Sequence, residues 1–267
     1  MKQLTYILIL CLCFTYVDAQ EIIVLDTNYS LSEKEALVIL NGFGDSRKNR
    51  KIQKEFFRDK GYDLFIPEYV NRRSMDMTIK YFSNLYDEYN LDEYKEVKFL
   101  CYIVGGYVLN EHIQTHGSGR ITTIIYDRSP IQERAPKTVI KRMKIISQMI
   151  YGRVLYDFSK LELYSLGNKY DIEVGIIIES KATRLMRYFR KTSDSYGAYT
   201  YVPEEIDANQ DDFMYTYLDH NMMYERFDVI GEDILHFLEF GRFTNKTRRI
   251  PYNWDPFEKI KKNDINL

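Results

Sequence analysis

Short, almost purely apolar runs alternate with helical patterns along most of this 267-residue chain. Residues 37–40 (LVIL) and 175–178 (GIII) are the clearest of these runs, because neither contains a polar residue. A strand that is covered by helices on both faces is apolar throughout, whereas a half-exposed strand alternates apolar with polar residues. The pattern therefore predicts an α/β fold with a mostly parallel central sheet and helices on both faces.

The elements that we expect follow from these two periodicities. Strands are predicted at 21–26, 36–41, 63–67, 97–104, 121–127, 173–179 and 213–218, and helices at 48–60, 74–89, 106–115, 137–151, 183–191 and 226–240. The last helix is the clearest, because Phe227, Ile230, Ile234, Phe237 and Leu238 share one face.

The first nineteen residues have the pattern of a secretory signal peptide. Lys2 precedes an apolar core at 4–16, and Val17-Asp18-Ala19 forms a small-residue cleavage site. The apolar run is shorter than the roughly 20 residues that a membrane-spanning helix needs, so an uncleaved anchor is the weaker alternative. We expect a secreted or periplasmic protein that starts at Gln20 and has no stable membrane span after cleavage.

Composition restricts how the mature chain is stabilised and what it binds. Of the three cysteines, Cys11 and Cys13 fall in the signal peptide, so Cys101 has no internal disulfide partner. The 37 basic residues nearly balance the 39 acidic ones, which disfavours nucleic acid as a partner.

No complete dinucleotide or phosphate-loop motif is present, so we expect no cofactor. His112 and His116 are spaced like a helical metal pair but lack a nearby third ligand, and we interpret them as surface residues without a metal.

Four segments, in order, resemble the α/β-hydrolase superfamily of lipases, esterases and thioesterases. They are 38–46 (VILNGFGDS), 61–69 (GYDLFIPEY), 99–106 (FLCYIVGG) and 219–241, which begins DHN. In the family these segments correspond to the oxyanion loop, the next strand, the nucleophile elbow, and the catalytic-histidine loop with its closing helix. The resemblance implies one domain over 20–243, a small helical cap at about 137–167, and a C-terminal extension at 244–267.

The elbow departs from the family pattern at its most important position. The family motif is Gly-x-Ser-x-Gly, in which the serine on a tight strand-to-helix turn attacks the substrate. Ile103 stands at the serine position here, and its side chain has no nucleophilic atom. Cys101, two residues earlier, is better interpreted as a buried small hydrophobe than as a substitute nucleophile.

Other parts of the catalytic machinery are implied by the same resemblance. His220 takes the place of the catalytic histidine, and Asp127, at the end of the 121–127 strand, is the better candidate for its acid than anything in the 179–183 loop. Pairing of Asp127 with Arg128, Glu133 or Arg134 is the structural alternative. The oxyanion and pocket residues implied are Asn41, Gly42, Phe43, Tyr102, Val104, Gly105 and Gly106.

Three functions are compatible with these residues. The leading hypothesis is a pseudo-hydrolase that has lost serine chemistry, keeps a ligand pocket, and binds an unknown small molecule or protein partner. The second is an atypical hydrolase or lyase in which His220, oriented by Asp127, acts as general base on an ester- or carbonyl-containing substrate. The third is a serine esterase that uses Ser129 or Ser46, although neither lies in a Gly-x-Ser-x-Gly turn. In each case we expect Met143, Ile146, Met149 and Ile150 to face inward from the cap.

Overall fold

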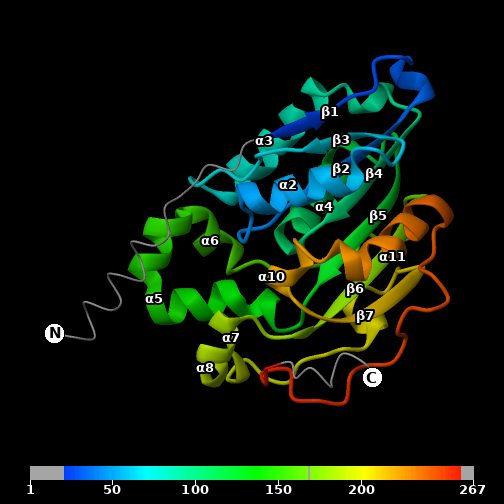
Figure 1. Cartoon of the computed structure of the whole chain (residues 1–267). Helices are drawn as coiled ribbons and strands as arrows, with labels where there is room; N and C mark the ends of the chain where they lie inside the picture. The colour runs from blue at the N-terminus through cyan, green and yellow to red at the C-terminus, as the bar shows by residue number, and fades with distance from the viewer. Residues whose placement is uncertain (1–20, 168, 260–267) are drawn as a thin grey trace.

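A computed structural model describes residues 21–167 and 169–259, so the predicted signal peptide lies outside the described residues. Seven strands form one sheet in the order β1-β3-β2-β4-β5-β6-β7, as Figure 1 shows. All neighbouring strands are parallel except β1, which is antiparallel to β3. The strands are β1 (Ile22–Val24), β2 (Glu35–Leu40), β3 (Tyr62–Ile66), β4 (Glu96–Cys101), β5 (Ile121–Arg128), β6 (Glu173–Lys181) and β7 (Asp212–Asp219).

Helices cover both faces of the sheet, as expected from the apolar strand sequences. The α-helices are α2 (Arg47–Phe57), α3 (Met75–Glu88), α4 (Ile103–His116), α5 (Ala135–Tyr151), α6 (Arg153–Phe158), α7 (Arg184–Tyr188), α8 (Arg190–Asp194), α9 (Pro203–Ile206), α10 (His220–Met223) and α11 (Phe227–Phe240). Short 3₁₀ helices lie at Leu31–Glu33, Leu91–Glu93 and Gln132–Arg134. Within the described residues, no helix has the length and apolarity that crossing a membrane requires.

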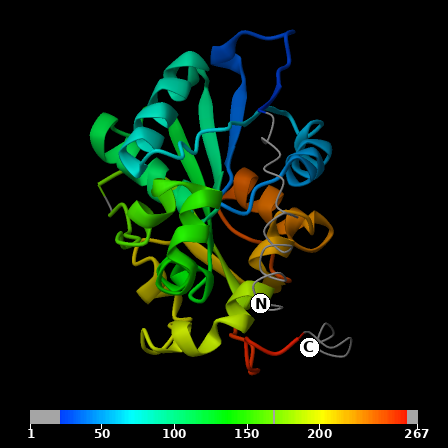
Figure 2. The same ribbon diagram turned by 90° about the vertical axis from the view of Figure 1, so that its left-hand side faces the viewer.

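The sheet separates two apolar cores. Ala36, Val38 and Leu40 of β2 point into the core under α3, α4 and α6, whereas Leu37 and Ile39 point into the core under α2 and α11. Figure 2 shows these two helical layers on opposite sides of the strands. Successive side chains of a strand point to opposite faces, so a strand between two helical layers needs apolar residues at every position.

The predicted strand at 97–104 is too long, and this correction affects the elbow. β4 ends at Cys101, Tyr102 is extended (φ −79°, ψ 156°), and α4 begins at Ile103. The apolar, partly β-branched sequence of 99–104 favours a strand locally. The chain turns earlier because Ile103 and Val104 are buried in the core under α4, where the helix packs against the sheet. The predicted helix at 183–191 also differs, since Phe189 (φ −98°, ψ 18°) separates α7 from α8.

The cap region consists of α5 and α6, which meet at Gly152. α5 is bent at Met143, whose backbone (φ −143°, ψ 44°) is not helical. The predicted inward orientation of the apolar residues is wrong for Met149, which is 73% exposed. Beyond α11, the C-terminal segment lies against the end of β6, where Trp254 Nε1 donates a hydrogen bond to the Ser180 carbonyl (3.3 Å).

The glycine at 105 sets how closely α4 approaches β2. A Cβ at this position would lie 2.6 Å from Leu40 Cβ and would also collide with the Leu40 carbonyl oxygen. We expect Gly105→Ala to lower the free energy of unfolding by about 1–3 kcal/mol, because backbone must move to admit the methyl group. Urea unfolding followed by circular dichroism measures the change. Gln114→Ala, on the exposed face of the same helix, is the matched control, and an equal effect of both substitutions would contradict the close-packing argument.

Candidate functional site

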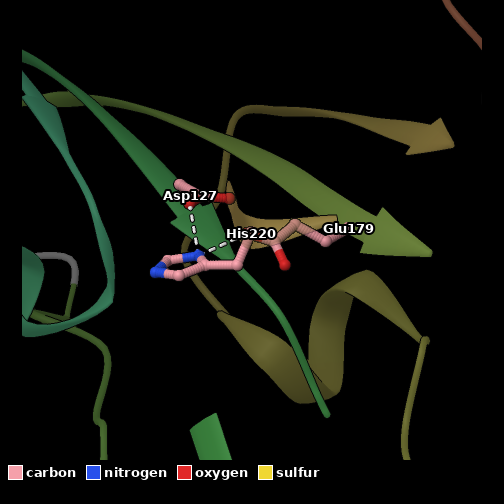
Figure 3. Close-up of side chains that lie close together, drawn as sticks. All are labelled: Asp127, Glu179 and His220. Carbon is pink, nitrogen blue, oxygen red and sulfur yellow. Dashed lines mark hydrogen bonds and ion pairs between the residues drawn. The ribbon is translucent and has the colours of Figure 1, made fainter. Parts of the chain in front are cut away.

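Three adjacent strand ends bring Asp127, Glu179 and His220 together (Figure 3). Asp127 lies near the C-terminal end of β5, Glu179 lies on β6, and His220 follows β7 directly. The side chain of Asp219 accepts hydrogen bonds from the backbone N–H groups of Asn221 and Met222, so it caps α10 and fixes the turn that carries His220. The carboxyl ends of parallel strands are where α/β sheets bind ligands, so these residues occupy the edge at which a site is expected.

His220 is held by two carboxylates through one ring nitrogen. Nδ1 lies 2.6 Å from Glu179 Oε1 and 3.2 Å from Asp127 Oδ2, and all three side chains are buried. The Glu179 contact has hydrogen-bond geometry, whereas Asp127 approaches the ring without a directed hydrogen bond and neither of its oxygens has another partner. Glu179 therefore orients the ring through a hydrogen bond, and Asp127 lies beside the same nitrogen.

The charges determine the protonation state of the histidine. Burial lowers the pKa of His220, but Glu179 and then Asp127 outweigh burial and raise it to about 10. Burial and the nearby Asp127 raise the pKa of Glu179 well above its ordinary value. The raised pKa of His220 favours the charged imidazole, in which both ring nitrogens are hydrogen-bond donors.

Asp127 and His220, which the sequence predicts as acid and histidine, do lie together, but Glu179 is nearer to the ring. Glu179 was passed over in favour of Asp127 because the sequence predicts that the strand ends at residue 179 and that the 179–183 loop, which contains no aspartate, follows it. The strand continues to Lys181, so Glu179 points from within β6 into the site. The signal available in the sequence was a single carboxylate directly after the apolar run 175–178. Arg128, an alternative partner for Asp127, forms its ion pair with Glu133 instead (2.7 Å).

A tyrosine occupies the other side of the imidazole. The Tyr224 hydroxyl lies 3.3 Å from His220 Nε2, and the backbone N–H of Gly42 donates a hydrogen bond to the same oxygen (3.2 Å). Burial raises the pKa of Tyr224 well above its ordinary value, so the phenol is neutral; its oxygen accepts the Gly42 N–H and lies within hydrogen-bond distance of Nε2. The Tyr102 ring stacks on Tyr224 with centroids 4.1 Å apart, and the Tyr102 hydroxyl donates to the Met223 carbonyl (3.0 Å).

The glycine-rich loop after β2 is shaped around this tyrosine. A Cβ at Gly42 would lie 3.0 Å from the Tyr224 hydroxyl, and one at Gly44 would lie 3.3 Å from the ring. Asn41, which the resemblance implies as an oxyanion residue, has intramolecular partners for its amide. Asn41 Nδ2 donates to Gln53 Oε1 (2.9 Å) and to Asp45 Oδ1 (3.1 Å), within a buried polar network.

Ile103, at the nucleophile position of the elbow, is buried in the core and is not exposed to a substrate. It is 7% exposed, and Asn90 is the single non-glycine residue with positive φ among those described, so the strained backbone of a nucleophile elbow is absent there. Cys101 is fully buried, and burial raises the pKa of its thiol well above the ordinary value. Neither residue provides an attacking atom.

Little space remains beside Ile103. The cavity that Ile103 shares with Gly106, Tyr126 and Asp127 has a volume of about 10 Å³, which is room for about one water molecule. Above it, the Phe43 ring contacts the rings of Tyr151 and Phe158 of the cap, with centroids 5.8 Å apart in both pairs. A larger cavity of about 190 Å³ is lined by residues that include Ser165, Tyr170, Asp207 and Asn209, and neither Ile103 nor His220 lines it.

Metal binding fits these residues poorly. Asp127, Glu179 and His220 are the group of metal-ligand type that the described residues bring together. All three side chains are buried, and an ion there would have to displace the proton that His220 Nδ1 shares with Glu179. The expectation that His112 is a surface residue is wrong, since it is 4% exposed and its Nδ1 lies 3.0 Å from Ser83 Oγ.

Known proteins share the fold of this chain. One solved structure with this fold is an α/β-hydrolase enzyme from the metagenome of sediments of the lagoon of Mar Chica, Morocco, with a TM-score of 0.52 and 14% identity over 82% of this chain and 98% of that one. Another is a bromoperoxidase from Bacillus anthracis, with a TM-score of 0.55 and 12% identity over 82% of this chain and 100% of that one. No protein-family model and no curated protein sequence matches the chain. At these identities the likeness shows the α/β-hydrolase fold alone.

The charge on His220 is testable by substitution of its nearest carboxylate. In Glu179→Gln we expect the pKa of His220 to fall below about 10, because the largest charge that raises it is removed while the side-chain shape is kept. Histidine resonances followed by NMR as a function of pH report the change. His112, whose pKa burial and then His116 lower to about 4, is an internal control that should not move. An unchanged His220 titration would contradict this assignment.

The same pKa has a consequence for stability. The folded pKa of His220 lies above its ordinary value of 6.5, so its stabilising effect is complete below about pH 6.5 and is lost as the pH rises through about 10.

The Tyr224 hydroxyl is testable by removing one atom. We expect Tyr224→Phe to lower the free energy of unfolding by about 1–3 kcal/mol, because the buried Gly42 N–H loses its acceptor and charged His220 loses a partner. Chemical denaturation measures the difference. Tyr188→Phe removes the same atom from a side chain that is 82% exposed and should be near neutral. Equal effects at both positions would disprove the role of the buried hydroxyl.

Proposed function

We propose that this α/β-hydrolase-fold protein is an exported, non-catalytic pseudo-hydrolase. The observation that carries the proposal is the Tyr224 hydroxyl, which takes up both the Gly42 N–H and the Nε2 side of His220. In acyl transfer the loop N–H stabilises the developing oxyanion, and the histidine nitrogen accepts a proton from the nucleophile. Here both groups serve the folded structure, and the nucleophile position holds Ile103.

The charge state of His220 supports the same conclusion. A general base must be unprotonated, and a catalytic pKa lies near the working pH. His220, with a pKa of about 10, holds its proton at neutral pH, and its free edge faces Tyr224 rather than solvent. The serines considered as alternative nucleophiles act as helix or turn caps. Ser46 Oγ accepts from the Asn49 N–H and Ser129 Oγ from the Gln132 N–H.

The atypical hydrolase remains the second candidate, because Asp127 and Glu179 orient the imidazole as an acid partner would. It requires Tyr224 to leave the ring before substrate enters. The leading hypothesis from the sequence also includes a retained ligand pocket. That pocket cannot lie at Ile103, because the cavity there admits about one water. We therefore place any binding role on other surfaces of the fold.

Ester hydrolysis tests the proposal directly. We expect the wild-type protein to hydrolyse short- and long-chain p-nitrophenyl esters no faster than His220→Ala, because Ile103 has no attacking atom and the Tyr224 hydroxyl beside the histidine is buried and holds the Gly42 N–H. We also expect Ile103→Ser to remain inactive, since Tyr224 still holds both donors. Release of p-nitrophenol is followed by absorbance. Wild-type turnover that disappears in His220→Ala would overturn the proposal in favour of the second candidate.

Export is tested separately, by determining the N-terminus of the protein after expression in a secreting host. A start at Gln20 outside the cell is the expected result. A protein that stays in the cell and keeps residues 1–19 would contradict export.

A further inference from the structure

The cap helix α5 presents aliphatic side chains to solvent in its distal half. Ile145 is 76% exposed and Met149 is 73% exposed, and they lie one turn apart on the same face of the helix. Ile146 and Ile150, beside them, are only partly buried. Scattered exposed apolar residues are ordinary, but neighbouring ones on a helix face indicate an interaction surface.

The charged residues of α5 are all basic. Its sequence contains Lys137, Lys141, Arg142 and Lys144 and no acidic residue, although basic and acidic residues nearly balance over the whole chain. Lys141, Arg142 and Lys144 are exposed and precede Ile145 by one to four residues; Arg142 also donates a hydrogen bond to Thr192, and Lys141 and Lys144 lie over the rings of Tyr196 and Tyr156.

Further cations lie at the other end of the aliphatic pair. Exposed Arg72 donates a hydrogen bond to the Met149 carbonyl (2.6 Å), so it is held at this end of the helix, and Arg73 beside it is also exposed. Arg153 is paired with Asp157 (3.3 Å). Cations thus border the aliphatic pair on two sides.

The backbone holds this segment as a separate short helix. The break at Met143 redirects residues 144–151, and the Arg72 hydrogen bond ties their last turn to the body of the domain. Figure 1 shows α5 and α6 on the opposite side of the molecule from α11. The aliphatic pair is therefore presented on a fixed element at the edge of the fold.

We propose that the distal half of α5 docks on the surface of an anionic lipid bilayer. A basic amphipathic helix binds such a surface through two contributions, apolar side chains that enter the boundary of the acyl chains and cations that stay among the headgroups. Ile145 and Met149 supply the first, and Lys141, Arg142, Lys144 and Arg72 supply the second. An acidic protein partner would satisfy the cations but gives no reason for two adjacent aliphatic side chains to be exposed among them.

Vesicle co-sedimentation of the exported protein, freed of the apolar leader, tests the proposal. We expect binding to vesicles of phosphatidylcholine mixed with phosphatidylglycerol, weak binding to phosphatidylcholine alone, and weaker binding at high salt. Ile145→Ser/Met149→Ser and Lys141→Gln/Lys144→Gln should each reduce the partition coefficient by about tenfold or more. These side chains are exposed, so the variants should fold.

Two controls make the result specific. Phe240→Ser removes another exposed apolar side chain (54%), on α11, and should bind like wild type. Tyr188→Phe, an exposed change on α7, should also bind like wild type, and sedimentation measures binding alone, so the outcome does not depend on the proposed loss of catalysis. The proposal is overturned if the wild type does not bind anionic vesicles, if the aliphatic double variant binds as well as wild type, or if Phe240→Ser loses as much. Equal binding of wild type and the aliphatic double variant to soluble heparin, without vesicle binding, would indicate an acidic macromolecule instead.

Discussion

A charged imidazole is buried between two carboxylates at the C-terminal edge of the sheet, and much of the site follows from that charge. His220 keeps its proton because Glu179 and Asp127 oppose the effect of burial on its pKa. A buried cation needs every donor satisfied, so Nε2 requires an acceptor as well as Nδ1. The Tyr224 hydroxyl is the hydrogen-bond partner of Nε2, so it occupies the side of the ring that a reacting group would otherwise need.

The tyrosine in turn determines the loop and the elbow. Its ring lies against Tyr102 on one side and against the glycines at 42 and 44 on the other, which leaves no space for substrate between them. With no nucleophile to present, the turn into α4 has ordinary backbone angles, and Ile103 packs into the core. Strained residues persist where function requires them, and their absence here fits a site that has been taken over by packing.

The layered fold was predictable from the sequence because a strand between two apolar cores has apolar residues on both of its faces. β2 is apolar at successive positions, so two covered faces follow directly from residues 37–40. The turn at the elbow was harder to predict, because the apolar sequence at 99–104 favours a strand. Its position depends on the packing of α4 on Leu40. Asp127 and His220 were found from their positions at strand ends. Glu179 and Tyr224 were not, because their roles depend on how β6 and α10 lie relative to β7, which no local pattern specifies.

The same reasoning explains why the cap differs from the body of the domain. Residues of the sheet and of α4 are constrained by neighbours on every side, so their apolar character has a structural cause. Ile145 and Met149 have no such cause, because removing them from solvent would require a surface that the described chain does not supply. The packing of the sheet and of α4 gives no structural reason for exposed aliphatic side chains among cations. Their chemistry points outward, to a partner that is apolar inside and anionic at its surface.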